Sequence, residues 1–109
     1  MKLYIAVLDD CPDHMVPTVV AHAMLAAHLQ NKDNQYYNKW LEESFKKVVV
    51  RVNQKEFDKI AAFPYCYLGY ESTILEGRNC CAIPLPVRRD EELPNVLKFA
   101  RMWKPKNDA

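Results

Sequence analysis

The first eight residues constrain the fold more than any other segment, because they predict a β-strand that is apolar on both faces. Successive side chains of a strand point to opposite sides. Both alternating sets here are apolar: Leu3, Ile5 and Val7 on one side, and Tyr4, Ala6 and Leu8 on the other. Such a strand needs cover above and below, so we expect it to be central in its sheet, with helices on both faces.

The rest of the chain alternates between amphipathic helices and apolar or β-branched strands. The pattern predicts helices over 17–30, 35–45 and 54–62, strands over 46–52, 65–70 and 79–85, and a final helix from the acidic residues 90–92 to Trp103. Asn53 and Glu56 have the spacing of a capping pair for the third helix. This order predicts an α/β fold, a three-layer α/β/α sandwich around a mixed sheet of about four strands.

The first predicted helix carries two apolar stripes instead of one. The main stripe contains Val16, Val20, Ala23, Met24 and Ala27. The second stripe contains His22, Leu25, Ala26 and Leu29. A helix that is apolar on most of its circumference is typically covered on most sides, so we expect this one to be unusually buried.

The chain length sets the domain count. With 109 residues, half of them hydrophobic, we expect residues 1–109 to form a single domain with one core. The initial apolar run is too short for a signal peptide or a membrane span, which favours a cytoplasmic protein with no membrane partner. Residues 104–109 are expected to be frayed. No glycine-rich phosphate loop or nucleophile-elbow motif occurs, which argues against the common nucleotide-binding and hydrolase folds.

An acidic loop follows the first strand. Asp9, Asp10, Asp13 and His14 gather potential ligands within six residues, but they fit no calcium-loop or zinc-helix spacing. We therefore expect a solvated, helix-capping loop, and neither a metal ion nor another cofactor.

The four cysteines do not form a C-x-x-C motif. Cys11 with His14 or His22 is a candidate thiolate–imidazole pair, although no third group is evident that would orient the imidazole. The alternative, which we favour, is that the cysteines are buried free thiols.

The basic residues give no general argument for nucleic acid, because the net charge is only +1. Lys46, Arg51 and Arg78, together with Lys47, Arg88 and Arg89, are candidates for a local phosphate-binding face. The alternative is that they are ordinary solvated side chains.

The whole pattern resembles the class II (archaeal and eukaryotic type) peptidyl-tRNA hydrolases. The resemblance rests on the helix segment VVAHA with His22 and Ala23, the short tryptophan-containing helix, the VVVRV strand with its N-x-x-E helix, and the segment EGRNCCAIPLP. It extends over nearly the full chain and implies the fold of that family. A wider group of small proteins with the same fold is similar to the same extent.

The resemblance implies hydrolysis of the ester between a peptide and tRNA, which requires activated water, a polarised carbonyl and a grip on phosphates. The candidate catalytic residues are His22, Glu71, Thr73 and Asp10, and the candidate RNA-binding residues are Lys46, Arg51 and Arg78. In that family the site also contains a lysine in the loop before the first helix and a glutamine on that helix. In this sequence the two positions fall near Met15 and Val19, whose side chains provide neither a charge nor an amide.

This departure keeps a second interpretation open. A catalytically inactive binding or assembly module of the same fold needs none of the missing groups. Exposed apolar residues of the first or last helix would then form a homodimer. A tRNA partner belongs to the first interpretation, and a second copy of the chain belongs to the second.

Overall fold

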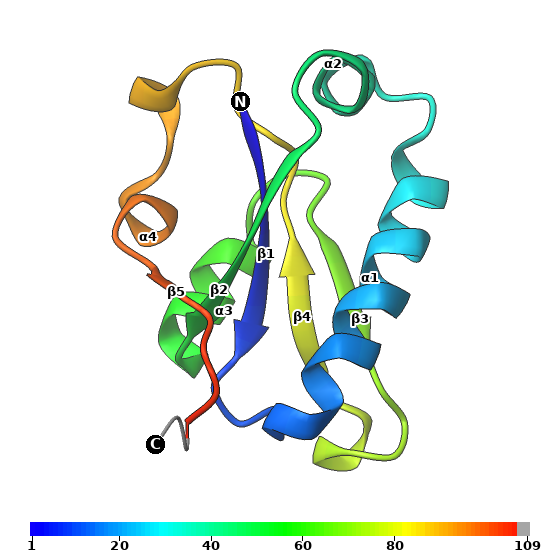
Figure 1. The fold of residues 1–109 in the computed structure, drawn as a ribbon, viewed down its shortest axis with the longest axis vertical. Helices are drawn as coiled ribbons and strands as arrows, with labels where there is room; N and C mark the ends of the chain where they lie inside the picture. Colours follow the sequence, from blue (N-terminus) through cyan, green and yellow to red (C-terminus); the bar gives the residue numbers. More distant parts are fainter. Residues whose placement is uncertain (107–109) are drawn as a thin grey trace.

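The structure is a computed structural model that describes residues 1–106, and it contains a mixed five-stranded sheet with four helices (Figure 1). The elements are β1 (Lys2–Leu8), α1 (Val16–Asn31), α2 (Gln35–Glu43), β2 (Lys46–Val52), α3 (Gln54–Ala61), β3 (Tyr67–Tyr70), β4 (Asn79–Ile83), α4 (Asn95–Lys98) and β5 (Arg101–Met102). The strand order is β3-β4-β1-β2-β5. The predicted α/β class with a mixed sheet is confirmed.

β1 lies at the centre of the sheet, as its two apolar faces predicted. It pairs in parallel with β2 from Lys2 opposite Lys46 to Leu8 opposite Val52, and it pairs antiparallel with β4. Its side chains from Ile5 to Leu8 are almost completely buried. β1 and β2 therefore end on the same side of the sheet, which is the edge formed by strand ends and is distinct from the lateral edge strands β3 and β5.

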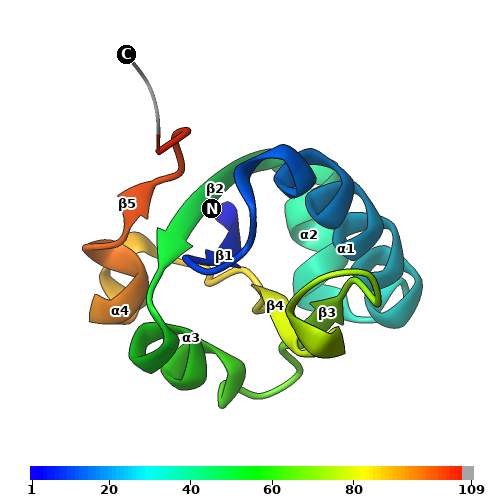
Figure 2. The ribbon, with the colours of Figure 1, turned by 90° about the horizontal axis from the view of Figure 1, so that it is seen from below.

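Helices lie on both faces of this sheet (Figure 2). α1 packs on β3 and β4, whereas α3 packs on the opposite face against β1, β4 and β2. α2 lies on the α1 side and α4 beside α3. One hydrophobic core extends through both sides of the sheet, which is the cover that a doubly apolar central strand requires.

α2 is held by the largest aromatic side chain in the core. Trp40 is fully buried, and its Nε1–H donates to the carbonyl oxygen of Lys46 at 2.7 Å. Its ring packs against Tyr37 and Phe45, with centroids 5.4 and 5.7 Å away. Asn34 caps the helix by accepting from the backbone N–H groups of the first turn. This cluster fixes the connection from α2 into β2.

The predicted capping pair of α3 is confirmed. Asn53 Oδ1 accepts from the Glu56 backbone N–H at 2.8 Å, and Glu56 Oε1 accepts from the Asn53 N–H at 2.8 Å. The helix begins directly after β2 because two of its otherwise unpaired N-terminal donors are satisfied locally.

The prediction that α1 is buried on nearly all sides is wrong. Its main stripe packs on the sheet, with Val16, Ala23 and Ala27 in the core. Its second stripe faces solvent: Leu25 is 65 % exposed, Leu29 is 59 % exposed, and His22 is exposed as well. The sheet offers α1 one face to pack on, and nothing else in residues 1–106 covers the outer stripe.

The prediction of one long final helix is also wrong, and the sheet has five strands instead of the predicted number of about four. The 90–103 segment forms one turn of 3-10 helix, the four-residue α4 and the short strand β5. Pro94 interrupts a continuous helix because it has no N–H and restricts the residue before it. Beyond α4, the Trp103 N–H donates to the Val49 carbonyl at 2.9 Å, so this end of the chain joins the sheet.

None of the helices in the described part of the chain has the length and apolarity that crossing a bilayer requires.

The two tryptophans provide a matched test of this packing. Trp40 donates a buried hydrogen bond, whereas Trp103 Nε1 is buried with no partner in residues 1–106. We expect Trp40→Phe to lower the free energy of unfolding by about 2–3 kcal/mol, because it leaves a carbonyl unpaired and a void in the core. Trp103→Phe should cost less than about 1 kcal/mol, because it removes an unsatisfied donor. Urea unfolding followed by far-ultraviolet circular dichroism measures both, and equal losses would contradict this account.

Candidate functional site

The polar residues that follow β1 and β2 meet at one edge of the sheet. The Asp9 N–H donates to the Val52 carbonyl at 2.7 Å, which joins the two strand ends. A hollow of about 420 Å³ opens here, lined by Asp9, Arg51, Val52, Asn53, Glu56, Phe99 and Arg101. Its position at the carboxyl ends of parallel strands is the usual place for a binding site in an α/β fold.

Arg51 is the central cation of this edge, and its guanidinium is already engaged. Nη1 lies 3.3 Å from Asp9 Oδ1, and Nη2 lies 3.2 Å from Asp13 Oδ1. Nη2 also donates to the Lys104 carbonyl at 2.6 Å, and the guanidinium carbon lies 5.1 Å from the centroid of the Trp103 ring. Arg51 therefore ties the C-terminal segment to the acidic loop instead of presenting a free charge to a phosphate.

The C-terminal segment closes the same edge, contrary to the prediction that it is frayed from Lys104 onward. The Lys106 N–H donates to Asp13 Oδ2 at 2.6 Å, and Lys106 Nζ donates to the Asp9 carbonyl at 2.6 Å. The backbone N–H of Lys106, followed by the Arg51 guanidinium, holds the pKa of Asp13 below its usual value. Residues 107–109, the last part of the predicted tail, lie outside the described residues.

The predicted catalytic residues lie on the β3–β4 loop, the β1–α1 loop and α1. The Thr73 hydroxyl and backbone N–H donate to Glu71 Oε1 at 2.9 and 3.2 Å, and these bonds, helped by the charge of nearby His22, lower the pKa of Glu71. Asp10 Oδ2 lies 3.7 Å from Arg78 Nη2 in a solvent-exposed ion pair. The structure thus joins Glu71 to Thr73 by hydrogen bonds, with His22 within electrostatic range of Glu71, and it pairs Asp10 with Arg78.

The β3–β4 loop contains an unusual backbone conformation directly after these residues. Leu75, Glu76 and Gly77 have φ angles of 49°, 54° and 74°. Left-handed conformations are unfavourable for residues with a Cβ, by about 1–2 kcal/mol each, and the cost falls here on Leu75 and Glu76. Gly77 alone adopts this geometry without that penalty.

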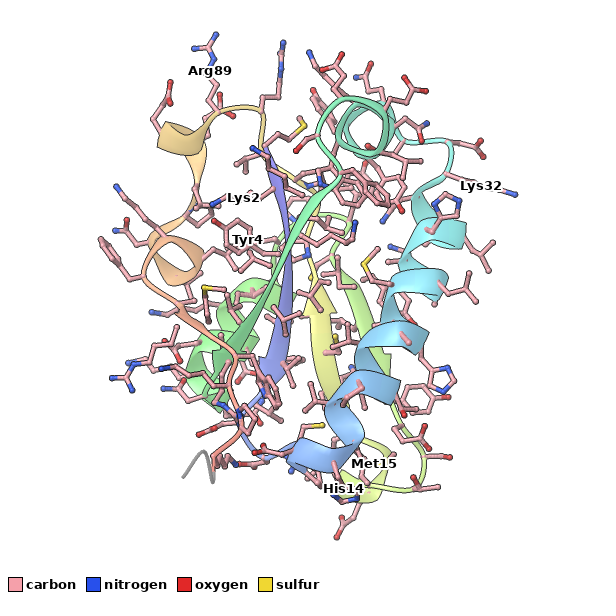
Figure 3. The ribbon with its side chains drawn as sticks, in the orientation of Figure 1. Lys2, Tyr4, His14, Met15, Lys32 and Arg89 are labelled. Atoms are coloured by element: carbon pink, nitrogen blue, oxygen red, sulfur yellow. The ribbon has the colours of Figure 1, made fainter. Side chains whose placement is uncertain are left out.

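The positions that correspond to the family's lysine and glutamine provide no polarising group. Val19 is only 3 % exposed and packs in the core, so its position points away from any solvent-filled hollow. Met15 is half-buried against the core, next to His14 at the end of the molecule where α1 begins (Figure 3). His22 lies about two turns further along α1 and does not line the 420 Å³ hollow.

The predicted RNA-binding residues are not gathered on one face. Lys46 starts β2 and Arg51 lies near its end, roughly 16 Å away along the strand. Arg51 and Arg78 lie near the same edge of the sheet, but each is paired with an aspartate. These three residues do not form a continuous free cationic patch.

All four cysteines are free thiols, and Cys11, Cys80 and Cys81 are completely buried. Burial, reinforced by the neighbouring Cys80 thiol, raises the pKa of Cys11 to about 11. Burial also raises the pKa of Cys66 to about 11 and the pKa values of Cys80 and Cys81. The preferred prediction of buried thiols is confirmed for Cys11, Cys80 and Cys81, whereas Cys66 is half-buried. The thiolate–imidazole pair at Cys11 receives no support.

Within residues 1–106, no three His, Cys, Asp or Glu side chains are grouped so that they could hold a metal ion. The aspartates of the acidic loop instead accept hydrogen bonds from Arg51 and Lys106.

Several residues of this edge gave no usable signal in the sequence. Lys106, Trp103 and Arg101 come from a segment that was predicted to be helical or frayed. They reach the site only because β5 pairs with β2, with Arg101 opposite Arg51. The pairing of distant segments cannot be deduced from a run of two strand residues.

The chain matches no protein-family model, and the search of the curated proteins also gives no match.

The raised pKa values predict that the thiols are unreactive in the native protein. A pKa near 11 instead of 9.0 lowers the thiolate fraction of Cys11 at pH 8 by about a hundredfold. We expect iodoacetamide to modify the folded protein at least roughly tenfold more slowly than the urea-unfolded chain, with half-buried Cys66 reacting first. Peptide mass spectrometry identifies the modified residue. Preferential modification of Cys11 in the folded state would restore the nucleophile hypothesis.

Proposed function

We propose that this chain is a catalytically inactive assembly module with a peptidyl-tRNA hydrolase II-like fold, and that it forms a homodimer. The observation that carries this proposal is the uncovered apolar stripe of α1. The sixteen residues of α1 include no Asp, Glu, Lys or Arg. A surface helix normally has a charged outer face, whereas a helix that is apolar on both sides is typical of a buried position.

The strand on which α1 packs is an unprotected edge of the sheet. β3 is an edge strand, and its sequence YLGY contains neither a charge nor a proline. Tyr65 and Tyr70, which flank or end this strand, are 71 % and 62 % exposed. Natural proteins usually blunt such edges with lysine, proline or a covering element. We call His22, Leu25 and Leu29 of α1, together with the outer edge of β3, the α1/β3 surface.

The size of this surface favours a second copy of the chain as its partner. α1 is about 24 Å long, which is too little to bury the roughly 800 Å² per partner of a standard interface by itself. Adding the β3 edge extends the contact and supplies backbone donors and acceptors. A two-fold axis beside β3 pairs each edge with its own copy, so that both apolar stripes and both unpaired edges are covered by one symmetric contact.

The opposite edge of the sheet is a weaker candidate. β5 has only two residues, and one of them is Arg101. Phe99 and Met102 are exposed there, but a charged, two-residue strand is the kind of edge that resists pairing. The proposed interface therefore uses the first helix and not the last.

The dimer predicts a specific response to charge. Leu25→Glu places a carboxylate in the apolar contact of both protomers and removes two leucines worth about 1.5–3 kcal/mol each, so dimerisation should weaken by at least about a hundredfold. Sedimentation equilibrium measures the dissociation constant, and circular dichroism shows whether the variant remains folded.

Met102→Glu is the matched control, because it introduces the same charge at an apolar residue that is equally exposed on the other edge. It should leave the dimer unchanged. A monomeric parent protein at all concentrations would refute the assembly proposal, and dissociation caused by Met102→Glu alone would move the interface to β5.

A second candidate function is hydrolysis of peptidyl-tRNA, favoured by the proximity of His22, Glu71 and Thr73. In this mechanism His22 acts as the general base for water, and Glu71 orients the imidazole. The carbonyl-polarising group would have to come from Arg78, because Met15 and Val19 cannot supply it. The exposed position of His22 and the existing ion pair of Arg78 make this the weaker candidate.

A direct assay separates the two functions. We expect the purified protein to release no peptide from peptidyl-tRNA above the buffer rate, because Met15 and Val19 supply no cation and Arg78 is already paired with Asp10. Release of labelled peptide, measured by acid precipitation, quantifies the rate. Release that is abolished in His22→Ala but retained in Leu25→Glu would establish the hydrolase, with tRNA as its partner.

We also propose a cytoplasmic location for this module. Its support is the reduced state of four cysteines, since reducing compartments keep such thiols free.

A further inference from the structure

A second cavity is lined by Tyr36 of α2 and by the segment that follows β4. α2 and this segment lie at the same end of the sheet (Figure 1). It has a volume of about 550 Å³, within the range of small-molecule sites. Its apolar wall includes Tyr36, Phe63, Pro64, Pro84, Pro86 and Leu97. Arg88 and Glu92 also line it and are its charged residues.

A smaller hollow of about 210 Å³ adjoins this cavity. It is lined by Gln35, Tyr36, Lys39 and Arg88, so Tyr36 and Arg88 belong to both. We call the two hollows together the composite cavity. The larger part is mainly apolar and the smaller part is basic, and the two share Tyr36 and Arg88.

The cations of the composite cavity are available for a ligand. Among the side chains that the structure describes, neither Lys39 nor Arg88 lies within ion-pair distance of a carboxylate. By contrast, the ion pairs of Arg51 and Arg78 at the other end of the sheet are already formed. A ligand that fits here has an anionic group beside an apolar body.

The chemistry of the walls favours a planar ring over an acyl chain. Tyr36 and Phe63 are aromatic, and proline rings also pack well against flat faces. Glu92 adds a carboxylate that needs N–H donors from its partner, which an acyl chain does not have. A purine with N–H groups on its edge satisfies both requirements.

From these features, we propose that the composite cavity binds a purine nucleoside monophosphate. The base packs against Tyr36 and Phe63, Glu92 accepts hydrogen bonds from the edge of the base, and Arg88 with Lys39 binds the phosphate. Among the common purines, guanine presents two adjacent N–H donors and is the best match for a carboxylate.

The site is largely formed before the ligand arrives. Proline has a fixed φ and few side-chain conformations, so walls built from Pro64, Pro84 and Pro86 lose little freedom on binding. Tyr36 lies in the first turn of α2, where its N–H is held by Asn34 Oδ1 at 2.9 Å. This site does not include the α1/β3 surface and does not depend on the proposed dimer.

The test is a titration of the full chain with guanosine monophosphate, followed by amide chemical shifts and isothermal calorimetry. We expect saturable binding with one site per chain. Arg88→Gln should weaken it roughly tenfold or more, because it removes a charge-assisted contact to phosphate. Tyr36→Leu should weaken it as well, because it retains apolar contact but loses the aromatic face.

Arg89→Gln is the matched control. Arg89 is the next residue, it is exposed, and its side chain extends away from the molecule (Figure 3). It does not line either hollow, so this variant should bind like the parent. An equal loss in Arg88→Gln and Arg89→Gln would indicate only a general effect of net charge and would overturn the site.

Two further ligands test the chemical class. Ribose 5-phosphate has the anion without the base, and octanoate has an anion on an acyl chain. Binding of either as tightly as the nucleotide would overturn the purine assignment, as would the absence of any saturable nucleotide binding. The dimer dissociation constant is measured separately with Leu25→Glu, so failure of one proposal leaves the other intact.

Discussion

The in-register parallel pairing of β1 with β2 is the constraint on which the other features depend. It places β1 in the middle of the sheet, where both of its apolar faces need a helix layer, and it brings two carboxyl-terminal strand ends to one edge. The polar residues that follow those ends then face one another. Arg51 lies between Asp9 and Asp13 for this reason, although 42 and 38 residues separate it from them along the chain.

The charged side chains of this edge mainly pair with one another. A catalytic centre needs unpaired cations and an accessible base near a solvent-filled space. Here Arg51 and Arg78 are each paired with an aspartate, and Val19 of α1 is buried in the core. Arg51 and Asp13 instead fasten the C-terminal segment to the end of β2 and to the acidic loop.

The unsatisfied surfaces lie elsewhere on the molecule. The outer stripe of α1 and the edge of β3 are apolar without cover, and among the described side chains Lys39 and Arg88 of the composite cavity form no ion pair. The α1/β3 surface offers apolar area to a partner, and the composite cavity offers positive charge to a ligand. Both are consistent with a protein that acts by binding, and they use different faces, so a dimer and a ligand do not compete for the same residues.

The sequence by itself determined the elements whose signals are local. The alternating apolar residues of β1, the β-branched run of β2 and the Asn53–Glu56 cap all depend on near neighbours, and all three were predicted correctly. Only the tertiary structure decided which apolar stripe of α1 meets the sheet, that Arg101–Met102 forms a strand, and that Lys106 reaches Asp13. These outcomes depend on contacts between residues far apart in the chain, whose free energies compete with helix propensity and leave no periodic pattern in the sequence.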